Sequence, residues 1–432
     1  MNVGNTPTTS LLNGLLLGRT AASAETGPGD AIWDTGHEGH LITVAPTGSG
    51  KGVSCIIPAL LTWQGPAVVI DPRGENVAVT ARHRRAMGHQ VLVLDPYGVT
   101  DEPQSASLNP MDLLDPNSDD FEDDCALIAH LLVQDKLSTI DPFWDERATA
   151  LIITIIKALY TLYPYKTFTL QDVKGLLVNP HGIPSYRDPT DDAQTFDRKF
   201  QMFAALFSET EFSSGRTRSS IFSSASSHLG FLRSTAVAKA TSNSTIMLDD
   251  VRAGAMQTIY IVLPPDKLVP MAKLLRLWIG TILAAISRRR RLPPQPTLFI
   301  IDEAAQLGQL DSLRTGLTLM RGYGMRLWTF WQDLSQLKNL YPYDWESILN
   351  NCSTQQFFGA KTPYAQRALK NYLCGTVSTD DLDTGAMVLC REGKVSMVAR
   401  ADYRTDPMLA PLAAPNPFYE PVDLPTFAKV PT

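Results

Sequence analysis

The feature that most constrains this chain is a glycine-rich segment, residues 45–52, that follows the apolar run 41–44. A strand that ends in such a turn, with a lysine opening the next helix, binds phosphate. The backbone N–H groups point inward and Lys51 reaches the β/γ-phosphates. Two positions depart from this pattern, because Ala45 replaces a glycine and Gly52 replaces the hydroxyl residue that binds Mg²⁺. The alternative is an ordinary glycine-rich turn. We expect the phosphate contacts from Thr47, Gly48, Ser49, Gly50, Lys51, Gly52 and Val53.

Short β-branched runs alternate with helical patterns between residues 40 and 95. This alternation predicts a parallel sheet covered by crossover helices. We expect strands at 40–45, 67–71 and 91–95, and helices at 52–63 and 75–88. The later two strands end at Asp71 and Asp95, each followed by a proline that ends the ladder. Both aspartates should therefore lie at the carboxyl edge of the sheet, where open α/β folds bind ligands.

The pattern becomes helical after residue 110, without a convincing strand up to residue 245. Helices are expected at 125–133, 146–163, 169–178, 193–207 and 219–232. The alternation then returns, with strands at 258–263, 297–301, 325–331 and 353–358, helices at 268–288 and 310–322, and a hairpin of strands 386–390 and 394–400. We expect an α/β nucleotide-binding domain in two parts, 37–110 and 246–406, interrupted by an all-helical domain, 111–245. A partly flexible N-terminal extension (1–36) and a loose Pro/Ala-rich tail (407–432) would flank it.

A second strong motif closes the strand 297–301, which is apolar throughout and should be buried on both faces. Asp302 and Glu303 follow it. Two carboxylates beside a phosphate loop are what metal-assisted phosphoryl transfer requires. Asp302 would hold Mg²⁺, directly or through water, and Glu303 would orient and deprotonate the attacking water. The alternative is a pair of solvated carboxylates at a helix start, where negative charge is favourable.

Two further side chains lie at the ends of predicted elements. Gln332 follows the apolar strand 325–331, where an amide can sense the γ-phosphate through a hydrogen bond that hydrolysis breaks. Its alternative role is to begin a helix beside Asp333. Arg321 ends a helix, where the helix dipole favours a cation in any case.

The overall composition narrows the protein class. A chain of 432 residues with 44% hydrophobic and 19% charged residues is typical of a soluble globular protein of two or three domains. The net charge of -6 argues against a uniformly basic nucleic-acid-binding surface, but it permits a local basic lining. The five cysteines form no paired motif, which favours a reducing compartment and no zinc site. The apolar stretches 151–163 and 11–17 are too short to cross a bilayer.

Three other features receive structural interpretations. His37 and His40 are separated by two residues, whereas zincin helices need three, so we do not expect a metal site there. Residues 288–291 are four arginines at a helix end, which we interpret as a solvated terminus; the alternative is a patch that contacts DNA phosphates. The acidic loop 119–124 is interpreted as a solvated surface, with docking of a basic protein signal as the alternative.

Taken in order, these motifs resemble those of the TraG/TraD-type coupling ATPases of bacterial conjugation and type IV secretion. The resemblance extends from His37 to about Arg404 and rests on the segments 45–53, 68–75, 94–96, 108–110, 299–303 and 331–337. It implies a RecA-like motor domain interrupted by an all-α domain. It also implies a homo-hexameric ring around a central channel, and a role in bringing substrates to a secretion channel.

The same resemblance assigns roles to the candidate residues. Lys51, Asp302 and Glu303 match the phosphate lysine, the metal aspartate and the catalytic glutamate. Gln332 matches the γ-phosphate sensor, and Arg321 matches the arginine that reaches the neighbouring subunit's nucleotide. The implied cofactors are ATP and Mg²⁺. A glycine at position 52 occurs in part of the family.

The resemblance also implies a location and partners. These are the cytoplasmic side of the inner membrane, inner-membrane components of a type IV secretion system, a relaxase–DNA complex or an effector protein, and single- or double-stranded DNA. Family members usually carry N-terminal membrane helices, which residues 1–36 do not resemble. Either such helices were removed from this sequence or a separate partner tethers the protein to the membrane.

Three functional hypotheses follow. The leading one is an ATP-hydrolysing coupling motor that delivers a nucleoprotein or protein substrate to a secretion channel. The second is a nucleotide-gated substrate receptor with little turnover, because the missing hydroxyl at Gly52 should slow hydrolysis more than binding. The third is a cytosolic DNA-translocating motor of the FtsK/HerA type, against which the long helical insertion weighs.

Overall fold

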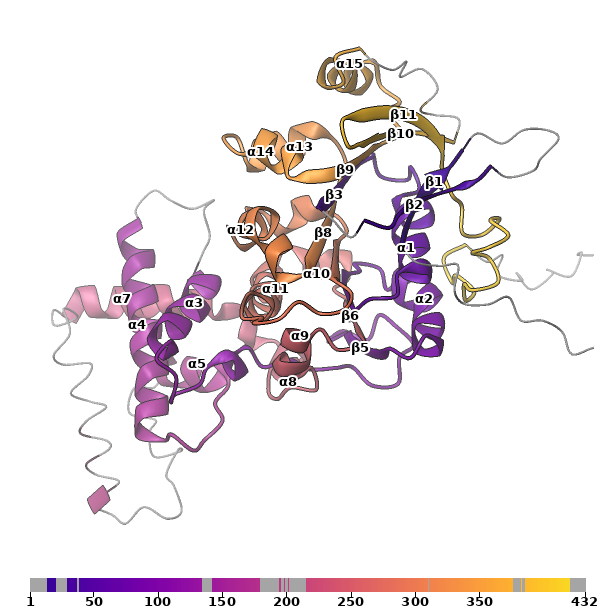
Figure 1. The fold of residues 1–432 in the computed structure, drawn as a ribbon. Helices are drawn as coiled ribbons and strands as arrows, with labels where there is room; N and C mark the ends of the chain where they lie inside the picture. The colour runs from indigo at the N-terminus through magenta and orange to yellow at the C-terminus, as the bar shows by residue number, and fades with distance from the viewer. Residues whose placement is uncertain are drawn as a thin grey trace, which may run out of the picture.

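The structure, a computed structural model, describes residues 14–20, 29–36, 39–133, 142–178, 194–195, 198, 201, 215–309, 311–375, 382 and 385–419. Its described strands form one eleven-stranded sheet (Figure 1). These strands are β1 (Leu15–Arg19), β2 (Ala31–Asp34), β3 (His40–Val44), β4 (Ala67–Ile70), β5 (Gln90–Leu94), β6 (Gln257–Ile261), β7 (Thr297–Ile301), β8 (Met325–Trp331), β9 (Cys352–Phe357), β10 (Ala386–Arg391) and β11 (Lys394–Ala399).

The strand order is β2-β1-β11-β10-β9-β3-β8-β7-β4-β6-β5. From β9 to β5 each printed pairing is parallel, whereas β10, β11, β1 and β2 extend the sheet by antiparallel pairing. β3 pairs with β8, and β8 pairs with β7. The carboxyl ends of these three parallel strands therefore meet at one edge, where ligands bind in such folds.

Helices cover both faces of this sheet, which explains why the central strands β3, β4, β6, β7 and β8 are buried at every position. Leu298 and Ile300 of β7 pack in one core cluster with residues of α1 and α2, while Phe299 and Ile301 pack in another with residues of α11. The helices of this part are α1 (Ile57–Thr62), α2 (Glu75–Ala86), α8 (Thr235–Ala240), α9 (Leu248–Ala253), α10 (Pro265–Leu268), α11 (Ala272–Ser287), α12 (Asp311–Leu319), α13 (Leu334–Leu340), α14 (Trp345–Asn350) and α15 (Pro363–Tyr372), with a π-helical turn η2 (Gly52–Ile56) and the 3₁₀ turns η7 (Ala304–Leu307) and η8 (Met320–Tyr323).

A group of helices projects from one side of the sheet (Figure 1). It consists of η3 (Pro110–Leu113), α3 (Phe121–Val133), α4 (Pro142–Leu162), α5 (Leu170–Val178), α7 (Gly215–His228) and η6 (Gly230–Arg233). Helix α11 joins this group to the sheet. A Cβ atom at Gly280 of α11 would lie 2.5 Å from Leu131 of α3, and Trp278 Nε1 donates to the Leu108 carbonyl at 3.0 Å. The two parts thus share one continuous core.

Most of the predicted elements are confirmed. β7 and β8 have the predicted bounds, and β10 and β11 form the predicted antiparallel hairpin. The described residues between 111 and 233 include no strand. The helix predicted at 268–288 is α11, which begins four residues later, and the one predicted at 310–322 is α12 followed by η8. The helix predicted at 193–207 lies largely outside the described residues, and the domain boundaries stay predictions.

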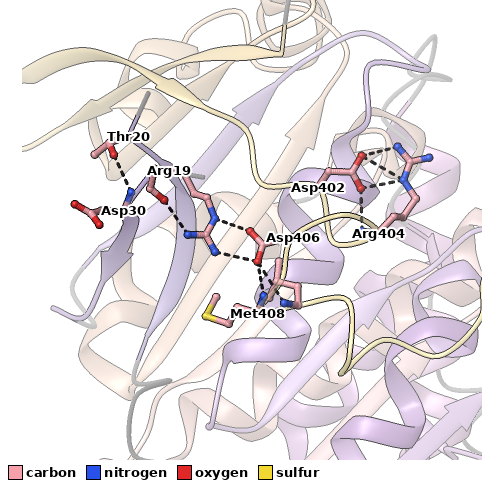
Figure 2. Close-up of polar contacts among 9 residues, drawn as sticks. Arg19, Thr20, Asp30, Asp402, Arg404, Asp406 and Met408 are labelled. Carbon is pink, nitrogen blue, oxygen red and sulfur yellow. Dashed lines mark hydrogen bonds and ion pairs between the residues drawn. The ribbon is translucent and has the colours of Figure 1, made fainter. Parts of the chain in front are cut away.

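The two ends of the chain differ from expectation. β1 and β2 add a pair of antiparallel strands before residue 37, where no strand was predicted. The segment after β11 is not loose up to residue 419, because Leu409 is fully buried. The guanidinium group of Arg19 explains the attachment, since its Nε and Nη2 atoms donate to the Asp406 carboxylate at 2.5 and 2.9 Å (Figure 2). Among the described residues, none of the helices has the length and apolarity needed to cross a membrane.

Candidate nucleotide-binding site

The glycine-rich segment forms the turn between β3 and η2. Gly48 and Gly50 have positive φ angles, 76° and 93°, which residues with a Cβ atom rarely adopt. Lys51 is buried at the start of the helix that follows, and its Nζ atom donates to the Ala45 carbonyl at 3.0 Å. The chain thus makes a turn of exposed backbone with a buried ammonium group beneath it. This is the geometry of a phosphate-binding loop.

The Glu303 carboxylate lies between two predicted phosphate ligands. Its Oε1 atom is 3.3 Å from Lys51 Nζ, and its Oε2 atom accepts a hydrogen bond from Gln332 Nε2 at 2.8 Å. A cation and an amide donor therefore converge on one anionic group. Because phosphate oxygens have the same acceptor chemistry as a carboxylate, this donor set fits a terminal phosphate group.

Asp302 and Glu303 leave the carboxyl end of β7 in an unusual conformation. Glu303 has a φ angle of 55°, in the left-handed region that a non-glycine residue enters at an energetic cost, and such strain clusters at functional sites. The Asp302 Oδ1 atom accepts from the Glu303 N–H at 3.0 Å. Burial and the neighbouring Glu303 carboxylate raise the pKa of Asp302 to about 6, against the opposing effect of Lys51. A divalent cation would relieve this unfavourable charge, so the residue fits a metal ligand.

These groups line one cleft of about 670 Å³, a volume typical of ligand pockets. Its lining includes each predicted phosphate contact, namely Thr47, Gly48, Ser49, Gly50, Lys51, Gly52 and Val53, together with Asp302, Glu303 and Gln332. A Cβ atom added at Gly52 would meet no atom within 4 Å, so crowding by the described residues does not explain the missing hydroxyl.

Arg321 is not among the described residues that line the cleft. It lies in η8, which precedes β8, and its side chain is exposed. The cleft is at the carboxyl end of β8, whereas Arg321 is at the amino end. Arg321 therefore lies at the opposite end of β8 from this cleft.

The sequence analysis missed part of the cleft wall. Glu75, at the start of α2, lines the cleft and was not predicted. Asp71 follows β4 and also lines the cleft, at the edge of the sheet where it was predicted, and burial raises its pKa to about 7. Arg400 follows β11, donates to the Ser49 carbonyl, and lies 5.0 Å from the centre of the Phe358 ring. Further along, Asp402, Arg404 and Tyr419 complete the wall. No motif in the sequence marks them.

Two of the features interpreted as structural have structural contacts. His40 Nδ1 accepts from the Leu327 N–H at 3.0 Å, and its pKa is lowered to about 4 by burial and by the nearby charges of Arg326 and Arg321. Arg289 is buried, and its guanidinium group donates to the carbonyls of Arg252, Val251, Tyr323 and Gly324 and to Thr297 Oγ1.

The other three arginines of the run 288–291 differ in their contacts and exposure. Arg288 pairs with Asp124 of α3, which is buried. The other acidic residues of the segment 119–124 are exposed, as interpreted from the sequence. Arg290 and Arg291 are exposed. The four arginines therefore do not form one solvated helix terminus. Arg288 and Arg289 make contacts within the fold, whereas Arg290 and Arg291 are exposed.

The loop after β9 approaches the phosphate loop closely. Gly359 has a φ angle of 70°, and a Cβ atom there would lie 2.7 Å from the Ser49 Cβ atom. Gly375 has almost the same φ angle, 69°, but a Cβ atom there would meet no atom of the described residues within 4 Å. Substitutions at these two positions can therefore distinguish the effect of backbone strain from the effect of crowding the phosphate loop.

We expect G359A and G375A each to lower the free energy of unfolding by about 1–2 kcal/mol, because alanine is strained in the left-handed region. Only G359A should also weaken nucleotide binding, by about tenfold, because it displaces Ser49. Urea unfolding and calorimetric titration with ATP measure the two effects. Equal nucleotide affinities for the two variants would contradict this assignment.

The sequence model of the family described as "Type IV secretory system Conjugative DNA transfer" matches residues 10–381. This chain belongs to that family. It is 28% identical over 344 residues to the conjugal transfer protein TraG of Escherichia coli, which covers 74% of this chain and 52% of TraG. It is 27% identical over 370 residues to the protein VirD4 of Agrobacterium fabrum, covering 80% of this chain and 51% of VirD4. The chain thus spans about half the length of these relatives.

Among solved structures, the fold is similar to that of the plasmid coupling protein TrwB in complex with the ATP analogue ADPNP. The TM-score is 0.64 at 16% identity, and the match covers 84% of this chain and 85% of TrwB. This likeness confirms the predicted fold class, an α/β RecA-like P-loop fold. The family membership confirms the predicted resemblance to coupling proteins of conjugation and type IV secretion.

Proposed function

We propose that this member of the conjugative DNA transfer family is an ATP-hydrolysing coupling protein. It would recruit a relaxase–DNA complex or an effector protein and deliver it to a type IV secretion channel. The observation that carries the proposal is the convergence of Lys51, Asp302, Glu303 and Gln332 on one cleft beside the phosphate loop. Residues that are about 250 positions apart in sequence meet there.

The contacts of Glu303 suggest how the site would work. Lys51 and Gln332 would exchange the Glu303 carboxylate for oxygens of a bound triphosphate, since both interactions are already directed at an anion. Glu303 would then be free to orient and deprotonate a water molecule, and Gln332 would sense the γ-phosphate. Asp302 would hold Mg²⁺, which supplies charge neutralisation for phosphoryl transfer.

The structural neighbour supports the choice of cofactors. TrwB has been solved with ADPNP and with ADP and Mg²⁺. Because Lys51, Asp302, Glu303 and Gln332 line one cleft with the phosphate loop, we propose that this chain also binds ATP and Mg²⁺. The proposal has three further parts. The protein would form a homo-hexameric ring at the cytoplasmic face of the inner membrane. It would contact inner-membrane secretion components and DNA, and a separate partner would tether it to the membrane.

Gly52 favours a second candidate, a nucleotide-gated receptor with little turnover, because the loop lacks the usual hydroxyl ligand for Mg²⁺. The ATPase rate, measured at several protein concentrations with and without DNA, distinguishes the two. A rate that rises with protein concentration and with DNA supports the motor. A negligible rate that stays flat, together with tight ATP binding, supports the receptor and contradicts the motor.

We further propose that Arg321 completes the site of the neighbouring subunit. Its position at the amino end of β8 keeps it away from its own cleft. R321A should lower the ATPase rate by about 10³-fold or more, as expected for an arginine that stabilises transition-state charge. K51A should also hydrolyse ATP more slowly, by about 10²- to 10³-fold.

A mixture of the two variants should regain activity, because a K51A subunit can supply Arg321 to the intact site of an R321A subunit. The rate of the mixture is compared with the sum of the separate rates. A mixture no more active than that sum would contradict a role across subunits.

A further inference from the structure

The cleft has a second wall, formed by residues that follow β11. Asp402, Arg404 and Tyr419 belong to it, and they lie beyond residue 381, where the match to the family model ends. The Tyr403 N–H donates to the Val53 carbonyl at 3.4 Å, so this wall lies against the first helical turn after the phosphate loop. In the proposed binding mode, Glu303 and Gln332 lie at the γ-phosphate end of the bound triphosphate. The nucleoside would extend from the other end of the phosphate loop and reach this second wall.

The segment that carries this wall is fixed at both ends. At its start, the Asp406 carboxylate accepts two hydrogen bonds from Arg19, and its Oδ1 atom also accepts from the Met408 N–H at 2.9 Å (Figure 2). Near its end, Asn416 Nδ2 donates to Glu75 Oε1 at 2.9 Å and to the Tyr403 hydroxyl at 2.8 Å. Because Glu75 itself lines the cleft, the segment is attached directly to the site.

Asn416 also fixes the position of Tyr419. The Tyr419 N–H donates to the Asn416 carbonyl at 3.1 Å, and the Phe418 N–H donates to Asn416 Oδ1 at 3.0 Å. The Arg404 guanidinium lies 5.4 Å from the centre of the Tyr419 ring, and its Nη2 atom pairs with Asp402 at 2.6 Å. Figure 2 shows Arg404 directed at Asp402. The pair is thus neutral overall, and Tyr419 remains 51% exposed.

We propose that Tyr419 and the Arg404–Asp402 pair form the platform on which the nucleobase stacks. This inference rests on the proposed binding of ATP and adds the element that recognises the nucleoside. A flat ring and a flat, charge-compensated guanidinium suit the face of a base, and stacking accepts any base because each has a π face. Asn416 acts as a positioning residue, since it holds Tyr419 without lining the cleft itself.

The test compares ligands with and without a base. Calorimetric titration in the presence of Mg²⁺ uses ATP, GTP and inorganic tripolyphosphate against the whole chain, Y419A and Y419F. We expect Y419A to weaken ATP and GTP binding by about 10- to 100-fold, the effect of losing one base–aromatic stack. Binding of tripolyphosphate should not change, and Y419F should bind all three ligands like the unaltered chain.

Two further variants make the result specific. N416A should show the same pattern with a smaller loss. It removes the side-chain contacts with Glu75, Tyr403 and the Phe418 N–H that hold this segment against the cleft, but it keeps the backbone carbonyl that accepts from the Tyr419 N–H. Y364A removes an exposed tyrosine of α15 that is outside the cleft lining, and its ATP affinity should not change. Unfolding temperatures of the variants verify that each is folded.

Two results would overturn the platform: an unchanged ATP affinity in Y419A, or an equal loss for ATP and tripolyphosphate. Either result leaves the proposed function in place if the unaltered chain binds ATP. If the unaltered chain binds neither ATP nor tripolyphosphate, the proposed function and this inference both fail.

Discussion

E303Q is expected to bind ATP and hydrolyse it about 10²- to 10⁴-fold more slowly, the contribution of a general base. Glutamine keeps the size of the side chain and its acceptor oxygen, so the contact with Gln332 can persist. Its loss of charge removes the ion pair with Lys51, which lies 3.3 Å away. The ammonium group is then available to phosphate, and ATP binding should be unchanged or tighter. Radiometric phosphate release and calorimetric titration measure the two quantities.

K51A is the companion variant, and it should lose both properties. It removes the buried cation that we propose contacts the terminal phosphate, and deleting one preorganised charge-stabilising group costs on the order of 10²–10³ in rate. K370A, an exposed lysine of α15, is the matched control and should behave like the unaltered chain. Hydrolysis by E303Q at the normal rate would exclude Glu303 as the base. ATP binding by K51A at the normal affinity would remove Lys51 from the site.

The sequence could predict that Lys51, Glu303 and Gln332 share one cleft, because two simple rules place these residues. A strand as apolar as 297–301 must be central and covered on both faces, and the carboxyl ends of neighbouring parallel strands share one edge. These rules bring Glu303 and Gln332 together with the loop after β3, as observed. The left-handed backbone of Glu303 could not be predicted, because it depends on how η7 packs against α11, α13 and β8.

The cleft wall that we propose for the nucleoside was missed for a physical reason. Arg404 and Tyr419 come from an irregular segment without hydrophobic periodicity, and local patterns carry no signal for such a segment. Its position depends on contacts across the whole chain, above all the pairing of Arg19 with Asp406, which are 387 positions apart. β1 was missed for a related reason: five residues make a short apolar run, and only pairing with β2 and β11 defines it as a strand.

The largest stability effect is expected from the buried ion pair that ties β2 to the central sheet. Arg326 of β8 donates from Nη2 to Asp34 Oδ2 at 2.6 Å and from Nε to the Gly39 carbonyl at 3.1 Å, and both charged side chains are almost fully buried. R326A should lower the free energy of unfolding by about 3–5 kcal/mol, because it leaves the Asp34 carboxylate buried without its main partner. R291A, which removes an exposed arginine, should change it by less than about 0.5 kcal/mol.

The origin of this loss can be tested with a second substitution. If the cost of R326A comes from the stranded charge rather than from the lost volume, R326M combined with D34L should restore most of the stability, since an apolar pair needs no solvation. Urea unfolding of the single and double variants, analysed as a cycle, measures the coupling. A double variant as unstable as R326A would mean that the guanidinium is needed for its backbone contact at Gly39, and β2 would then be held by shape and hydrogen bonding rather than by charge.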